Sequence, residues 1–213
     1  MSENKKIEAL YKLSNEFVSK AVKNSFIKEK FQESCKYEDL EKYPITDHDK
    51  EEQCPISTEF DELYEWIDNQ LLNRKVNYIF IHTTGTEQDV KVSSILKYWK
   101  NNLGWKNPGY HIIFPLEGYT VLSDLNDVVN GARNYNHNGI HLSYIGGIDK
   151  DGKPLDTRNE SQSNLLLLTV EKLLLKFPNA KIKLHNEVSN KACPSFDKET
   201  WNKEFGEFLK EKP

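Results

Sequence analysis

The run VNYIFIH (residues 76–82) is short, apolar and rich in β-branched and aromatic residues, and it ends at His82. A run of this length and composition predicts a buried strand rather than a helix. A histidine at the end of a buried strand is held by rigid backbone at the rim of a sheet. The stretch therefore predicts both a part of the core and a place for a functional side chain.

Downstream of this strand, the sequence alternates between strand and helix patterns. The expected elements are a helix at about 90–102, a β-hairpin made of YHIIF and YTVL after Asn107-Pro108-Gly109, a strand in GIHLSYIGG, an apolar helix at 161–177 stopped by Pro178, and a last strand, KIKLH, that ends at His185. Strands that alternate with helices indicate an α/β fold, with a central mixed β-sheet flanked by helices.

Residues 1–75 differ from the rest in pattern and in charge. They hold 12 Lys and Arg against 17 Asp and Glu, whereas residues 76–213 hold 17 against 16. Apolar residues spaced by three and four predict an amphipathic helix at 5–33. A loop or linker follows, and a second helix is expected after Ser57-Thr58-Glu59, ending near Asn73. We therefore expect an N-terminal helical extension (1–75) before the α/β domain (76–213).

The composition excludes several classes of protein. A net charge of -4 over 213 residues gives no electrostatic footprint for nucleic acid, so we expect no nucleic-acid partner. The three cysteines are too few for a secreted disulfide framework, and reduced thiols are expected. Neither a membrane-spanning apolar stretch nor the apolar core of a signal peptide is present. Synthesis in the cytoplasm, without membrane insertion, is the expectation.

Three residues stand where the predicted fold can bring them together. His82 and His185 end predicted strands, and Cys193 lies eight residues after His185, next to Pro194. Two imidazoles and a thiolate are a zinc-ligand set that leaves the fourth tetrahedral position for water, as catalytic zinc sites do. Spacing alone leaves an alternative open, in which the histidines are hydrogen-bonded structural residues and Cys193 is a small buried hydrophobe.

Four segments carry a resemblance to a known family. They are YIFIHTTGT, LKYWKNNLGWKNPGYHIIFPLEG, YNHNGIHLSYIGGIDKDGK and HNEVSNKACPSFD. In their order and separations they resemble the zinc-dependent N-acetylmuramoyl-L-alanine amidases of the phage-lysozyme and peptidoglycan-recognition-protein superfamily. The resemblance implies the mixed-sheet α/β fold of that family and one catalytic Zn²⁺. It also implies hydrolysis of the amide between N-acetylmuramic acid and L-alanine by a zinc-bound water.

The resemblance also implies roles for individual residues. His82, His185 and Cys193 correspond to the metal ligands, and Tyr110 and Lys191 to the catalytic residues. Lys191 would stabilise the tetrahedral oxyanion, while the Tyr110 phenol would hydrogen-bond the water or help transfer its proton to the leaving amine. The alternative reading is that Lys191 is a solvated charge and Tyr110 a packed aromatic.

Departures from the family pattern bear on the substrate groove. Arg133 stands where the family usually has a histidine, and its guanidinium suits a carboxylate of the stem peptide. Together with Tyr135 and His137 it is a candidate for substrate binding. His141 falls where the pattern has glycine, unless the alignment slips by one residue. His111, next to Tyr110 in a predicted strand, is expected on the opposite face in a structural role.

As a whole, the sequence predicts a wall-lytic hydrolase, either a phage endolysin or a related bacterial enzyme, with peptidoglycan as its partner. An endolysin waits in the cytoplasm until a holin or membrane damage admits it to the cell wall, in the periplasm or outside. Two alternatives stay open: a non-catalytic peptidoglycan receptor, and an amidase that also binds and regulates an RNA polymerase. Three interpretations of residues 1–75 stay open: packed helices, a wall-targeting module and a regulatory lid. In this segment, Cys35, His48 and Cys54 fit no standard metal-site spacing.

Overall fold

The computed structural model describes residues 60–210 of the 213-residue chain. Within this range Tyr64–Lys210 form one compact unit. The helix predicted at 5–33, and Cys35, His48 and Cys54, lie outside the described residues. The division of the chain at residues 75 and 76 therefore stays a prediction.

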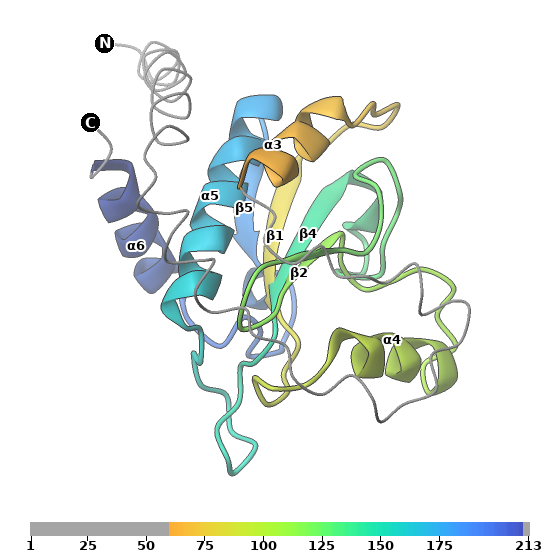
Figure 1. Ribbon diagram of the computed structural model, residues 1–213, viewed down its shortest axis with the longest axis vertical. Helices are drawn as coiled ribbons and strands as arrows, with labels where there is room; N and C mark the ends of the chain where they lie inside the picture. Colours follow the sequence, from red (N-terminus) through yellow and green to blue (C-terminus); the bar gives the residue numbers. More distant parts are fainter. Residues whose placement is uncertain (1–59, 211–213) are drawn as a thin grey trace. The chain divides into compact units, whose positions relative to one another are not determined.

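A five-stranded mixed sheet forms the centre of the unit (Figure 1). Its strands are β1 (Tyr78–Thr83), β2 (Ile112–Phe114), β3 (Thr120–Val121), β4 (Gly139–Tyr144) and β5 (Lys181–Leu184), in the order β3-β2-β4-β1-β5. β1 runs parallel to both β4 and β5, and β2 runs parallel to β4, whereas the short β3 pairs antiparallel with β2. The predicted mixed sheet of an α/β fold is confirmed.

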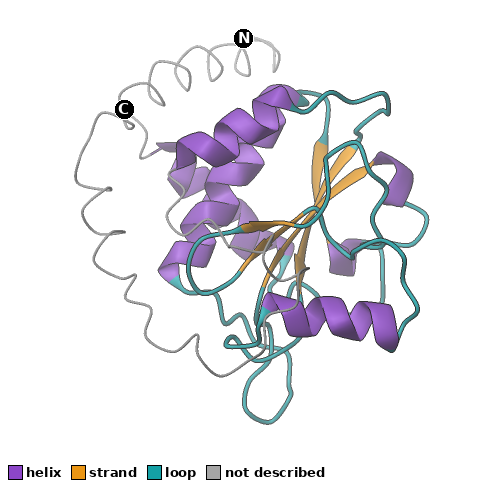
Figure 2. Ribbon diagram, turned by 45° about the vertical axis from the view of Figure 1, so that its right-hand side comes forward, coloured by secondary structure: helices purple, strands orange, loops and turns teal. Residues whose placement is uncertain are grey.

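Helices flank the sheet on both sides (Figure 2). They are α3 (Phe60–Asn69), α4 (Val92–Asn101), α5 (Glu160–Lys176) and α6 (Lys198–Lys210). The helices predicted at 90–102 and 161–177 are confirmed as α4 and α5, whereas α6 is not among the predicted elements. No helix within residues 60–210 has the length and apolar character needed to cross a membrane.

The helix expected to end near Asn73 ends four residues earlier, at Asn69. The residues that follow make tertiary hydrogen bonds that replace further helical turns. The side-chain oxygen of Gln70 accepts from the N–H of Leu125 at 3.2 Å, and the N–H of Asn73 donates to the side chain of Asn126 at 2.9 Å. These contacts draw the chain away from the helix axis.

Alternation along β1 separates the two faces of the sheet. Ile79 and Ile81 point to one face, and Phe80 and His82 to the other. The second face continues on β4, because Phe80 pairs with His141 and His82 with Ser143. Helix α4 covers part of this face through a cluster of Ile95, Trp99, Ile113 and Ile145. A row of polar side chains thus lies on a sheet face whose surroundings are apolar.

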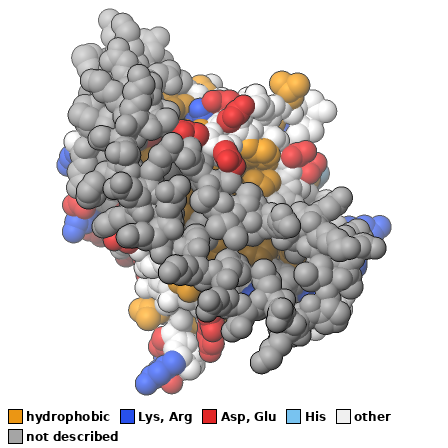
Figure 3. Space-filling view, viewed as in Figure 1, with side chains coloured by type: hydrophobic (Ala, Val, Ile, Leu, Met, Phe, Trp, Pro, Cys, Tyr) orange, Lys and Arg blue, Asp and Glu red, His pale blue; other side chains and the backbone are white. Residues whose placement is uncertain are grey.

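The surface of the described residues is mixed in charge. In the space-filling view both acidic and basic side chains appear on its visible part (Figure 3). Large apolar side chains that are exposed are few, and Leu71 and Tyr98 are the most exposed of them. Scattered single apolar residues of this kind are ordinary for a protein surface.

Candidate metal centre

Parallel pairing places two histidines side by side at the carboxyl ends of β1 and β5. Ile81 pairs with Leu184 in these adjacent strands, so the next residues, His82 and His185, are neighbours. Their ring centroids are 4.6 Å apart. His82 is only 1% exposed, and His185 is half-buried at the start of a short 3₁₀ turn.

The loop after this turn returns Cys193 to the end of β1. The N–H of Asn186 donates to the carbonyl of Cys193 at 2.7 Å, and its side-chain amide donates to the carbonyl of Phe196 at 3.1 Å. The hydroxyl of Tyr144 also donates to the carbonyl of Pro194 at 2.6 Å. These three hydrogen bonds fix the chain at Cys193 and in the residues just after it.

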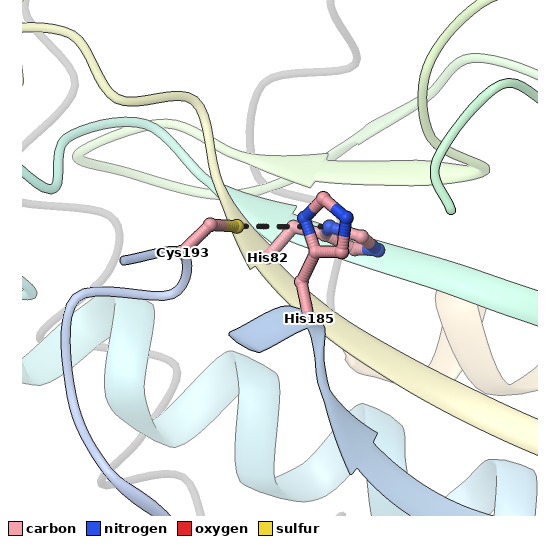
Figure 4. Close-up of side chains that lie close together, drawn as sticks. All are labelled: His82, His185 and Cys193. Carbon is pink, nitrogen blue, oxygen red and sulfur yellow. Dashed lines mark hydrogen bonds between the residues drawn. The ribbon is translucent and has the colours of Figure 1, made fainter. Parts of the chain in front are cut away.

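The side chains of His82, His185 and Cys193 converge on one point (Figure 4). One ligand atom from each lies within 4.8 Å of the others, and the sulfur of Cys193 is 3.7 Å from Nδ1 of His82. Two imidazole nitrogens and one sulfur are the donor types that Zn²⁺ takes in catalytic sites. The residues present therefore fit a zinc ion.

Electrostatics keep this centre free of charge at neutral pH. Burial first, and then the neighbouring His141 and His185, hold the pKa of His82 well below its usual value. Burial and the charge of Lys191 lower the pKa of His185 to about 4. Burial raises the pKa of the Cys193 thiol to about 12, against the opposing effects of the Thr83 N–H and Lys191. Both imidazoles thus keep a lone pair for a cation, and a cation would stabilise the thiolate.

Tyr110 lies against the centre, just before β2. Its ring centroid is 5.1 Å from that of His82 and 5.3 Å from that of Trp99, and its hydroxyl donates to the carbonyl of Thr83 at 3.3 Å. Gly109 permits this packing, because a Cβ there would come within 2.9 Å of the Trp99 ring. Burial raises the pKa of Tyr110, so its hydroxyl keeps its proton at neutral pH.

Lys191 is exposed in the loop that carries Cys193. Its N–H donates to the hydroxyl of Ser189 at 3.3 Å. The ammonium is close enough to lower the pKa values of His82, His185 and Cys193. An exposed cation thus stands beside the donor cluster. The catalytic roles of Lys191 and Tyr110 stay predictions.

Two further histidines extend the row on the same sheet face. Nδ1 of His141 lies 3.0 Å from Nε2 of His82, and the ring of His111 stacks on that of His141 at 5.9 Å and 5°. The expected separation of His111 and Tyr110 onto opposite faces is not seen, because both residues precede the first residue of β2. His111 does have the structural contacts expected of it: its Nδ1 accepts from the N–H of His141 at 3.0 Å.

The three candidates for substrate binding lie in one loop but in different surroundings. Arg133 and His137 are exposed and line a surface hollow of about 530 Å³ whose wall also includes Trp105. Tyr135 does not line that hollow. Its ring packs on Phe80 and Tyr78, each at 5.5 Å. Substrate binding by the three residues stays a prediction.

Arg74 holds this loop in place, and no sequence motif pointed to it. Its guanidinium donates to the carbonyls of Leu125 at 2.7 and 3.0 Å, His137 at 3.2 Å and Gly139 at 3.1 Å. One side chain thereby ties the start of β4 to the loop that precedes it. The only available signal was a basic residue next to the first strand, which has no specificity.

Phage endolysins are similar to this chain in sequence. The endolysin of Escherichia phage T7 is 38% identical over 127 residues, a match that covers 58% of this chain and 83% of that protein. The endolysin of Enterobacteria phage K11 is 32% identical over 133 residues, covering 61% and 87%. No family model matches the chain.

Solved structures agree in fold. The Ph2119 endolysin from a Thermus scotoductus bacteriophage has a TM-score of 0.54 at 20% identity, with 64% of this chain and 89% of that one covered. The N-acetylmuramoyl-L-alanine amidase LysCS from Clostridium intestinale also has a TM-score of 0.54, at 20% identity and with 63% and 86% covered. Bumblebee PGRP-SA has a TM-score of 0.51 at 16% identity, with 65% and 90% covered.

Proposed function

Because the chain belongs to the phage endolysins of the N-acetylmuramoyl-L-alanine amidase superfamily and is a peptidoglycan hydrolase, we propose which bond it cuts. It cleaves the amide between N-acetylmuramic acid and L-alanine with the help of one Zn²⁺. His82, His185 and Cys193 would hold the ion. The observation that carries the proposal is the convergence of their three ligand atoms within 4.8 Å.

The donor set supports zinc because its members are uncharged and poorly solvated until a cation arrives. Zn²⁺ bound by two imidazoles and a thiolate would lower the pKa of water toward about 7 and polarise a carbonyl, which is the chemistry that amide hydrolysis needs. The protein's own share of the work is to bind the stem peptide, exclude competing ligands and stabilise charge as it develops.

We assign the charge-stabilising role to Lys191. Attack on the amide carbonyl places a negative charge on its oxygen, and a cation aimed at that oxygen stabilises the transition state. Lys191 is two residues from Cys193 and exposed, so its ammonium is free to meet the substrate. The charge of Lys191 lowers the pKa values of His82 and His185, which supports a place for its ammonium beside the reacting atoms.

Tyr110 would act as a hydrogen-bond donor. Its hydroxyl reaches the carbonyl of Thr83, the same carbonyl that the sulfur of Cys193 approaches at 3.6 Å. From this position the phenol would orient the attacking water or pass a proton toward the leaving amine. Arg133, in the hollow beside Trp105, would bind a carboxylate of the stem peptide. The enzyme would act on the cell wall after release from the cytoplasm.

The test measures zinc and bond cleavage together. The full chain, dialysed against metal-free buffer, should retain close to one zinc per chain. On purified peptidoglycan it should release new amino groups of L-alanine without new reducing sugar ends. Cys193→Ser should lose both the zinc and the cleavage. Cys54→Ser is the matched control, because it makes the same exchange at a cysteine that is not one of the three proposed ligands.

Other outcomes would redirect the assignment. Stoichiometric zinc without cleavage would favour a receptor that binds peptidoglycan and does not cut it. Cleavage by a zinc-free chain would overturn the proposed mechanism. New reducing ends in place of new L-alanine amino groups would mean that the enzyme cuts the glycan strand.

A further inference from the structure

The two ring nitrogens of His82 face different partners. Nδ1 faces the donor cluster, 3.7 Å from the sulfur of Cys193. Nε2 faces away from it and lies 3.0 Å from Nδ1 of His141. Both rings are buried, with His82 1% and His141 0% exposed. The contact between them is therefore closed to water.

We propose that His141 is a positioning residue for the metal centre. Its Nδ1 accepts the Nε2–H of His82, and this hydrogen bond holds the His82 ring with Nδ1 free to bind the ion. This inference rests on the proposed zinc centre and adds a fourth residue to it. His141 would not touch the ion or the substrate, and it would act only through His82.

The assignment follows from the way a neutral imidazole carries its proton. A neutral ring has one N–H and one lone pair, so a ring that binds a metal through Nδ1 carries its hydrogen on Nε2. Metal-binding histidines usually give this second N–H to a carboxylate, a backbone carbonyl or a water. No such oxygen occupies that place among the described hydrogen bonds of His82. The lone pair of His141 Nδ1 takes it.

The opposite arrangement would disable the centre. If His141 donated from Nδ1 instead, Nε2 of His82 would accept, and the remaining hydrogen of His82 would sit on Nδ1. That hydrogen would point at the sulfur of Cys193 and occupy the lone pair that a cation needs. The 3.0 Å contact therefore couples the tautomer of His141 to the ability of His82 to bind metal.

His141 is held firmly enough to act as a fixed acceptor. Its ring stacks on the ring of Phe80, with centroids 5.1 Å apart and planes 7° apart, and on the ring of His111, at 5.9 Å and 5°. Its N–H and carbonyl are both paired with His111. These contacts leave the ring little freedom to turn away from His82.

Two glycines make the space for the ring. A Cβ on Gly131 would lie 2.3 Å from Nδ1 of His141, and a Cβ on Gly139 would lie 2.8 Å from its Nε2. Any side chain at Gly131 would thus collide with the atom that faces His82. The loop before β4 and the first residue of β4 are both shaped around this imidazole.

A purely structural role accounts poorly for His141. Its Nε2 is buried and has no hydrogen-bond partner within residues 60–210, and a buried polar atom without a partner destabilises the fold. An apolar side chain would fill the same space without that cost. The histidine is explained by what its other nitrogen does for His82.

The experiment compares zinc affinity among full-length variants of one position. His141→Phe keeps a flat ring and removes the acceptor, whereas His141→Asn places an amide oxygen near the position of Nδ1. We expect His141→Phe to weaken zinc binding about 10- to 100-fold, the range found for partners of metal ligands, and His141→Asn to restore most of that loss. Affinity is measured by competition with a chromogenic chelator. Val170→Ala, a buried truncation on α5, controls for general loss of stability.

A second measurement does not depend on the variants. Long-range ¹H–¹⁵N NMR of the zinc-loaded wild type should show His82 with its hydrogen on Nε2 and His141 with Nδ1 unprotonated. The opposite tautomer of His82 would overturn the inference, and so would unchanged zinc affinity in a folded His141→Phe. In both cases zinc binding by the wild type would leave the proposed function standing. A wild type that binds no zinc would overturn the proposed function itself.

Discussion

His82 and His185 are neighbours in the register of two parallel strands, with ring centroids 4.6 Å apart. The two histidines lie near opposite ends of the unit's sequence, and the pairing of strands in the sheet brings them together. Since hydrogen bonds between strands fix the register, the separation of the two imidazoles is set by backbone rather than by side-chain choice. Substitutions of side chains around the two histidines should therefore lower turnover more than they change the distance between the two imidazoles.

Replacing Lys191 should separate metal binding from turnover. Lys191→Ala removes an exposed cation and leaves the three donor atoms in place. We expect it to keep its zinc and to lower kcat by about 100- to 1000-fold, the loss of one charge-stabilising group. Lys191→Arg, which keeps the charge, should recover part of the rate. Loss of zinc in Lys191→Ala would mean that this residue supports the loop instead.

Removing the hydroxyl of Tyr110 should slow the reaction at a small cost in stability. Tyr110→Phe loses one hydrogen bond, to the carbonyl of Thr83, which is worth about 0.5–1.5 kcal/mol. We expect kcat to fall by about 100-fold or more with zinc retained. Tyr98→Phe, at an exposed tyrosine on α4, is the control. A normal rate in Tyr110→Phe would show that the ring alone is needed.

Arg74→Ala should destabilise the loop that carries Arg133 and His137. Its guanidinium donates to four backbone carbonyls, those of Leu125, Asn136, His137 and Gly139, which would lose this donor. We expect the free energy of unfolding to fall by about 1.5–3 kcal/mol, as for hydrogen bonds to a charged group. Urea denaturation measures it, with exposed Lys75→Ala as the control. Arg74→Lys should recover little, because an ammonium cannot reproduce the forked geometry.

His111 should make the fold sensitive to acid. Burial, and then the charge of Arg74, lower its pKa to about 3 in the folded protein, from 6.5. Between these values the unfolded chain binds a proton that the folded chain refuses, so stability falls as the pH drops below about 6.5. One such group contributes a slope of up to about 1.4 kcal/mol per pH unit.

The check is urea denaturation from pH 7 to pH 4. His111→Asn, which keeps an acceptor for the N–H of His141, should have a shallower slope than the wild type. His137→Asn, which makes the same exchange at an exposed histidine, is the matched control. Equal slopes in wild type and His111→Asn would show that other groups dominate the acid response.

Local pattern was enough to predict most of the fold. The strand predicted at 76–82, the helix at 161–177 and the hairpin after Gly109 each follow from periodicity or turn chemistry within a dozen residues. The end of α3 was predicted too late, because it is decided by hydrogen bonds that join Gln70 and Asn73 to a distant loop. Such contacts leave no trace in a local pattern.

The donor cluster was accessible to sequence because all three residues are marked by their neighbours. Two follow strand patterns, and Cys193 lies in a recognisable loop. Arg74 and His141 are different in kind. Arg74 binds backbone carbonyls, which have no sequence signature, and the partner of His141 lies 59 residues away on another strand. Only the packed sheet reveals either relationship.

The centre also draws on residues far apart in the chain, since 111 positions separate His82 from Cys193. During synthesis on the ribosome, the first imidazole emerges long before the thiol, so no partly made chain carries the complete set of donors. Metal capture would then coincide with the last stages of domain folding. Zinc content would report, molecule by molecule, whether the catalytic unit had been completed.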